Sequence, residues 1–79
     1  MSSKAAVGAI ELSSIGVGYQ VQDDLLKSAN VDLLVARTIC AGKYLIIVAG
    51  TVSDVETALE TARAVGKDAV VDVDPGKSL

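Results

Sequence analysis

The stretch that decides the fold spans residues 31–50 and reads VDLLVARTICAGKYLIIVAG. Residues 31–39 are predicted to form one strand, because they are mainly apolar and lie between turn-forming residues. Residues 44–49 form a continuous apolar run, which is typical of a central strand covered on both faces. Gly42 supplies the turn between the two runs. The centre of the chain is therefore a predicted strand–turn–strand unit.

A strand and a helix are predicted before this unit. Residues 5–12 (AAVGAIEL) are β-like, and Ser13 and Ser14 then offer a helix N-cap. Residues 15–29 have helical periodicity, with Gly16 and Gly18 weakening the first turn. The stripe predicted to face the core, which Val21 and Leu25 widen, consists of Ile15, Tyr19, Gln22, Leu26 and Ala29.

A second helix and strand are predicted after the unit. Ser53 and Glu56 are spaced as an S-x-x-E capping box, and Gly66 is a natural stop for the helix. Residues 69–73 (AVVDV) form the last predicted strand, and residues 75–79 are expected to be a loose tail. The helix face predicted to be buried consists of Val55, Ala58, Leu59, Ala62 and Val65.

The predicted order is β-α-β-β-α-β, within a single domain that spans residues 1–79. This order indicates an α+β fold of the ferredoxin-like kind, in which an antiparallel sheet carries both helices on one face. Many unrelated proteins share this fold, so the order of elements alone does not identify a function.

The composition excludes several classes of function. The net charge is −3 and the chain has two Tyr, no Trp and no Phe, which argues against nucleic-acid binding. The absence of His removes most acid–base and nucleophilic mechanisms. No apolar run is long enough for a membrane span or a signal peptide, so we expect a cytoplasmic protein with no membrane partner.

Apolar residues are in surplus for so small a domain. They make up 51% of the chain, yet a domain of this size buries only about 60% of its unfolded surface. We expect another copy or another protein to cover the remaining apolar surface. The alternative is a small core rich in Ala and Val with an adhesive surface.

The turn of the central unit holds the most unusual chemistry. Cys40, the one cysteine of the chain, is flanked by Arg37 and Lys43, and nearby positive charge favours the thiolate. One thiol does not hold a metal, but several copies that meet on a symmetry axis can. The alternative is that Cys40 is simply a small apolar residue. The close carboxylate pairs, Asp23–Asp24 and Asp72/Asp74, are interpreted as solvated surface, so no catalytic residue is expected.

Four blocks in order resemble the bacterial microcompartment shell proteins, from about residue 6 to residue 62. The blocks are AVGAIEL, DDLLKSANVDLLV, RTICAGKYLIIVAG and GTVSDVETALETA. Within them, KSANVDLLV and TICAGK are most similar to the first half of the tandem-domain shell proteins of diol-utilising compartments. The resemblance implies a non-enzymatic, structural protein that is a homo-oligomer, either a hexamer or, in a tandem protein, a trimer. It further implies flat discs that tile with other shell proteins into a shell in the cytoplasm, with a pore for small metabolites on the axis of each disc.

The resemblance also implies roles for particular residues. It assigns Arg37 and Lys43 to positions where they would bias the pore towards anions. Lys27 matches the lysine used in tiling at the disc edge, although an ordinary surface lysine is the alternative. Cys40 would ligate a 4Fe-4S cluster shared between copies on the axis. The residues matched to the pore loop are Thr38, Ile39, Cys40, Ala41 and Gly42.

The match weakens at the end of the chain, where DVDPGKSL replaces a longer tail of the family. A truncated form, or the first half of a tandem protein, is therefore expected. A different class remains open, namely a small regulatory module that binds a metabolite between subunits. Its ligand would lie at the helix start near Ser53–Glu56, where Asp54 and Glu56 disfavour an anion. An enzyme acting through a Cys40 thiolate is a third alternative.

Overall fold

The computed structural model describes residues 6–39 and 42–78, with the backbone alone described for residues 74–78. The elements in chain order are β1 (Ala6–Leu12), α1 (Ile15–Ser28), β2 (Asp32–Ile39), β3 (Lys43–Gly50), α2 (Val52–Gly66), the short 3-10 helix η1 (Lys67–Ala69) and β4 (Val70–Ser78). Apart from η1, the predicted order of elements is confirmed.

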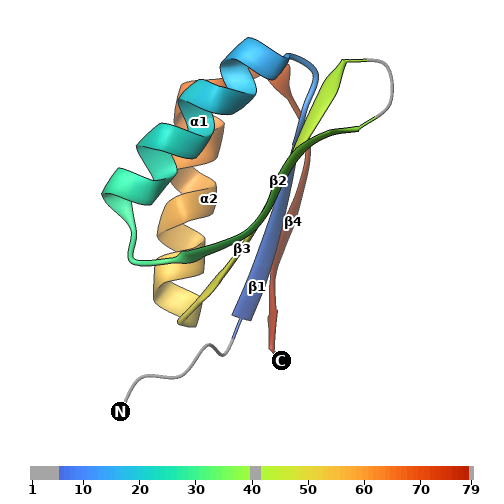
Figure 1. Ribbon diagram of the computed structural model, residues 1–79. Coiled ribbons are helices and arrows are strands. Elements are labelled where there is room, and N and C mark those ends of the chain that lie inside the picture. Colours follow the sequence, from blue (N-terminus) through green and yellow to red (C-terminus); the bar gives the residue numbers. More distant parts are fainter. Residues whose placement is uncertain (1–5, 40–41, 79) are drawn as a thin grey trace.

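The four strands form one sheet in the order β2-β3-β1-β4, with every neighbouring pair antiparallel. β1 and β2 lie on either side of β3, so the β1-α1-β2 unit is split by another strand. Both helices cover the same face of the sheet (Figure 1). The predicted α+β, ferredoxin-like fold is therefore confirmed.

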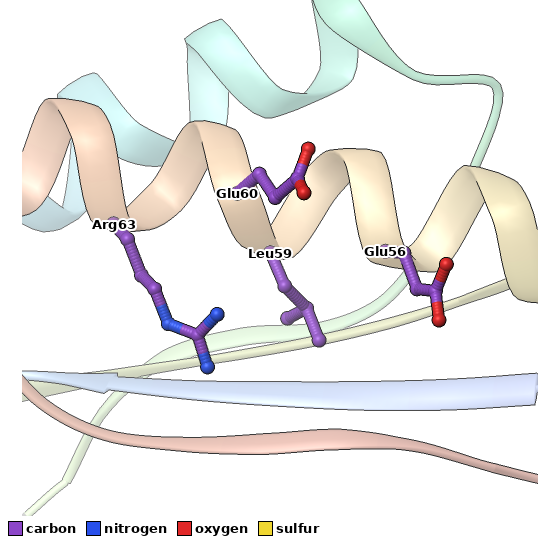
Figure 2. Close-up of a pocket in the computed structure, with 4 residues that line it drawn as sticks. All are labelled: Glu56, Leu59, Glu60 and Arg63. Carbon is purple, nitrogen blue, oxygen red and sulfur yellow. The ribbon is translucent and has the colours of Figure 1, made fainter.

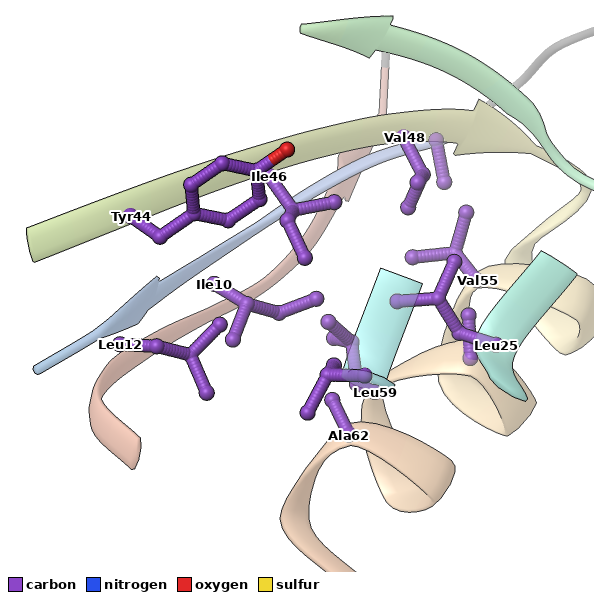
Figure 3. Close-up of a cluster of buried hydrophobic side chains, with 12 residues drawn as sticks. Ile10, Leu12, Leu25, Tyr44, Ile46, Val48, Val55, Leu59 and Ala62 are labelled. Carbon is purple, nitrogen blue, oxygen red and sulfur yellow. The ribbon is translucent and has the colours of Figure 1, made fainter. Parts of the chain in front are cut away.

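The core lies between the helices and the inner face of the sheet. Alternate residues of β1 are buried, because successive side chains of a strand point to opposite faces. Figure 3 shows strand side chains directed towards α2 and α1, with Ile10 and Ile46 at the centre. The residues of the core cluster are Ala6, Ile10, Leu12, Val21, Leu25, Tyr44, Ile46, Val48, Val55, Ala58, Leu59 and Ala62.

α1 begins where the sequence predicts, with the Ser14 hydroxyl accepting from the Val17 amide at 3.3 Å. The predicted stripe is confirmed at Val21 and Leu25, which are buried, and at Ile15 and Ala29, which pack against the core. It is wrong at Leu26, which is 38% exposed, and at Tyr19, which is 60% exposed. The helix turns Gly18 towards the sheet, where an added Cβ would lie 2.5 Å from the Tyr44 ring. This close approach decides which side of α1 meets the core.

α2 begins earlier than predicted. Its N-cap is Thr51, whose hydroxyl accepts from the Asp54 amide at 3.1 Å and donates to the Asp54 carboxylate at 2.9 Å. This reciprocal pair takes the place of the predicted box at Ser53 and Glu56. The helix ends at Gly66, as predicted, but Gly66 keeps helical dihedral angles and Lys67 adopts the positive φ of 49°.

The expected loose tail is wrong for residues 75–78, because β4 continues to Ser78 along β1. The register shifts between Ala9↔Asp74 and Val7↔Lys77, which leaves one extra residue in β4. A bulge at the edge of a sheet accommodates the Pro75–Gly76 pair, since no further strand needs the missing amide. Leu79 lies outside the described residues.

Candidate functional site

The hairpin of β2 and β3 is the candidate functional site, and at one end of the molecule it bends away from the two helices (Figure 1). The two strands pair from Asp32↔Ala49 to Ile39↔Lys43, with one irregularity between Leu33 and Val35. Gly42 has a φ of 82°, a conformation that other residues rarely adopt. The turn glycine was thus correctly predicted.

The predicted pore-loop residues differ in exposure, and the structure describes only three of the five. Thr38 and Ile39 are the last residues of β2, and Thr38 and Gly42 are exposed, whereas Ile39 is half-buried. Cys40 and Ala41 lie outside the described residues. The described part of the loop therefore consists of strand ends and a turn, with exposed positions on each side of the gap.

The two flanking cations have different surroundings. Arg37 is exposed, lies opposite Leu45 in the sheet register, and forms no ion pair with the residues that the structure describes. Lys43 Nζ lies 3.3 Å from Glu11 Oε2, with side chains 40% and 28% exposed. Part of the Lys43 charge is therefore balanced within the subunit, while that of Arg37 is available.

Lys27 lies away from the hairpin, in the last turn of α1. Its Nζ is 3.0 Å from Asp23 Oδ2, and both side chains are largely exposed. The hydrogen bond and the charge of Asp23 raise the pKa of Lys27 above its usual value. Lys27 is therefore a surface cation with a partner one helical turn away, and the structure does not bring it together with the hairpin residues.

The outer face of the sheet carries a group of apolar residues beside the charged Glu11, Arg37 and Lys43, and none of the described elements covers it (Figure 1). We define the outer sheet face as the half-buried apolar residues that alternate with the core positions. The prediction that β3 is covered on both faces is wrong within one subunit. The outer sheet face consists of Val7, Ala9, Val35, Ile39, Leu45 and Ile47.

A second uncovered apolar surface lies on α1. Tyr19 and Leu26 are 60% and 38% exposed, and Leu26 follows Tyr19 by seven positions, so they share one side of the helix. The Tyr19 ring meets the edge of Tyr44 at a centroid distance of 5.2 Å. Sequence periodicity found these residues but assigned them to the core, because it does not state which side of a helix is covered.

The described residues hold no cluster of metal-ligating side chains. A hollow of about 320 Å³ lies beside α2 and is lined by Glu56, Leu59, Glu60 and Arg63. Figure 2 shows that all four residues belong to α2 alone, with Arg63, Leu59 and Glu56 extending towards the strands. The start of α2, where the alternative metabolite site was expected, is occupied by the Thr51–Asp54 cap. None of the described helices is long and apolar enough to span a bilayer.

These features define a small ferredoxin-like α+β domain with uncovered apolar surfaces and an exposed hairpin. Residues 6–74 match the family model described as the BMC domain. The chain therefore belongs to the bacterial microcompartment (BMC) domain family, whose shell proteins are structural rather than enzymatic.

Two similar proteins support this assignment. The bacterial microcompartment shell protein PduT of Citrobacter freundii is 46% identical over 67 residues, which cover 85% of this chain and 36% of PduT. A crystal structure of a microcompartment protein from Desulfitobacterium hafniense superimposes with a TM-score of 0.87 at 32% identity, covering 91% of this chain and 40% of that one. The chain thus spans well under half the length of both. PduT is a tandem-domain shell protein, in agreement with the predicted resemblance.

Proposed function

We propose that this shell domain forms a cyclic homo-oligomer whose β2–β3 hairpins surround a pore for small metabolites. The ring is a hexamer, or a trimer where the domain is half of a tandem chain, and it tiles with other shell proteins. The observation that carries the proposal is the hairpin itself, whose end bends away from the helices beside the uncovered outer sheet face (Figure 1). A closed ring covers such surfaces without leading to open-ended fibres.

The charge near the hairpin favours anionic metabolites. Arg37 is exposed and unpaired among the described residues, whereas Lys43 is partly balanced by Glu11. A ring repeats each Arg37 around the axis, and rings of cations select for anions in pores. Arg37 is therefore the main contributor to the proposed selectivity, and Lys43 is the lesser one.

Oligomer size and shape test the ring. Size-exclusion chromatography with light scattering is expected to give a mass several times the 8.0 kDa of one chain, and electron microscopy is expected to show discs with three-fold or six-fold symmetry. A stable monomer at micromolar concentration would contradict the proposal. Strong stabilisation of that monomer by an amino acid or a nucleotide would favour the regulatory module instead.

We also propose that Cys40 ligates a 4Fe-4S cluster shared between copies. The chain has one cysteine, and the described residues offer no other group of ligands, so the thiolates must come from several subunits. The chain of one subunit supplies a soft thiolate donor, as such clusters require. When bound, the cluster would supply one-electron transfer.

Anaerobic reconstitution with iron and sulfide tests the cluster. The wild type is expected to gain visible absorbance and bound iron, and Cys40→Ser to gain neither while keeping the same oligomer mass. If wild type and variant show the same absence of iron and colour, the cluster proposal is wrong and the ring proposal stands.

The last role proposed is that of Lys27 in tiling. Its ammonium group is largely exposed near the end of α1 and pairs only with Asp23 among the described residues. Lys27→Ala is expected to leave single discs intact and to abolish flat arrays under electron microscopy, whereas Lys67→Ala serves as a lysine control. Arrays that form equally well in both variants would remove this role.

A further inference from the structure

The outer face of the sheet carries charged residues at the end nearest the hairpin turn. The strand register places one residue of each strand in a row across this face, and paired residues of neighbouring strands point to the same side. The row consists of Arg37, Leu45, Glu11 and Asp72. Lys43 lies on the same face, two residues before Leu45 and directly after the turn glycine. The positive charges beside the hairpin are therefore matched by carboxylates of β1 and β4.

The two cations are held differently. Lys43 Nζ lies 3.3 Å from Glu11 Oε2. Glu11 lies further from the turn than Lys43 does, because its partner in β3 is Leu45. The ion pair therefore directs the Lys43 ammonium back over the sheet and away from the turn. Arg37 is exposed and forms no ion pair with the residues that the structure describes, so its charge is not restrained in this way.

The pair of Lys43 and Glu11 places charge rather than holding the fold together. The two side chains are 40% and 28% exposed, and ion pairs in such positions contribute little to stability. Their effect on the electrostatic potential is larger, because a ring repeats the charges of each copy around one axis. Loss of the Glu11 carboxylate would add one positive charge per subunit beside the turn and release the Lys43 ammonium towards it.

We propose that Glu11 positions Lys43 away from the hairpin turn and thereby limits how strongly the pore prefers anions. This rests on the proposed ring and deepens it, since it assigns control of selectivity to a strand residue outside the loop. An anion has to enter a pore and also leave it, so too many unpaired cations around the axis would retain it. In this arrangement Arg37 attracts the anion while Lys43 stays paired.

Thiol reaction rates measure the potential at the hairpin. In a Cys40→Ser background, Thr38→Cys places a single thiol at an exposed position near the turn. The assembled oligomer is treated with an anionic and a cationic methanethiosulfonate of similar size, and the ratio of the two rates cancels differences in thiolate content. Adding Glu11→Gln is expected to raise the anionic-to-cationic ratio about fourfold at low salt, because one charge about 10 Å away acts on the two reagents with opposite sign. High salt should reduce this rise.

Matched variants separate the ion pair from charge in general. Asp72→Asn removes an exposed carboxylate from the same row, one strand further from Lys43, and is expected to raise the ratio less. Glu11→Asp keeps the charge and is expected to stay near the starting ratio, and Glu11→Gln combined with Lys43→Gln should abolish the rise.

Light scattering on each variant before reaction separates this proposal from that of the ring. If oligomers form and Glu11→Gln leaves the ratio unchanged, or if Asp72→Asn raises it equally, the role of Glu11 is wrong and the ring proposal stands. If only monomers form, the ring proposal fails, and the role of Glu11 in its pore fails with it.

Discussion

The two faces of the central sheet are made of similar residues but have different surroundings. On the inner face, Ile10 and Ile46 are fully buried against the helices. On the outer face, Leu45 and Ile47 flank Ile46 in β3 and are only half-buried. The comparison indicates that the inner face stabilises the subunit, whereas the outer face leaves apolar surface uncovered, as the proposed ring requires.

The largest difference in the free energy of unfolding is expected between alanine substitutions at the neighbouring residues Ile46 and Ile47. Ile46→Ala should lower the free energy of unfolding by about 2–5 kcal/mol, because it leaves a cavity in the core. Ile47→Ala should cost the isolated subunit clearly less and weaken the oligomer instead. Urea denaturation at several protein concentrations separates the two effects. If both variants lowered the unfolding free energy of the dissociated subunit equally, the two faces would not differ as described.

Gly16 and Gly18 in the first turns of α1 differ in how much space surrounds them, so alanine substitutions there compare an open position with a packed one. Gly18→Ala should destabilise by about 1–3 kcal/mol, since the new methyl group would collide with the Tyr44 ring. Gly16→Ala should stabilise by about 0.5–1 kcal/mol, because it adds helix propensity and its nearest contact is 4.0 Å away. Thermal melting measures both. Similar melting temperatures for the two variants would contradict the close approach of α1 to the sheet.

The hydroxyl of Tyr44 is the polar contact of the inner face that can be removed most cleanly. It donates to Gln22 Oε1 at 2.7 Å, and Tyr44→Phe should cost about 0.5–1.5 kcal/mol. Burial raises the pKa of Tyr44 above its usual value of 10.0. The folded state therefore holds this proton more tightly than the unfolded state, and the stabilisation is present below pH 10 and lost as the pH rises towards the higher folded pKa.

Denaturation midpoints on either side of pH 10 measure this linkage. The wild type is expected to lose stability with rising pH more steeply than Tyr44→Phe, and the difference between the two isolates Tyr44 from the lysines. Parallel pH profiles would indicate that Tyr44 is not desolvated in the folded state.

The smallest effect is expected on the outer face, at the pair of Lys43 and Glu11. The two side chains are partly exposed, so Lys43→Met should change the stability of the subunit by less than about 1 kcal/mol. This change should shrink further in high salt, because ions screen exposed pairs. Titration with urea at low and high salt measures this change in unfolding free energy. A larger loss of stability that is independent of salt would place the ion pair in a more buried site.

Much of the fold could be predicted from the sequence. The strands, the helices and the turn at Gly42 follow from local periodicity and from residues that stop or cap a helix. The start of α1 at Ser14 is confirmed, and the resemblance to the shell-protein family is confirmed. The second helix start was misplaced because two overlapping cap patterns, at Thr51 and Ser53, compete for the same turn.

The sequence by itself therefore determined the type and order of the elements, because these depend on neighbours only a few residues apart. The tertiary structure alone decided which side of α1 is covered, since that depends on Gly18 meeting Tyr44 across 26 residues. It also decided that Lys43 pairs with Glu11 and that one apolar face of the sheet stays uncovered. Such contacts join distant parts of the chain, and no local pattern specifies them.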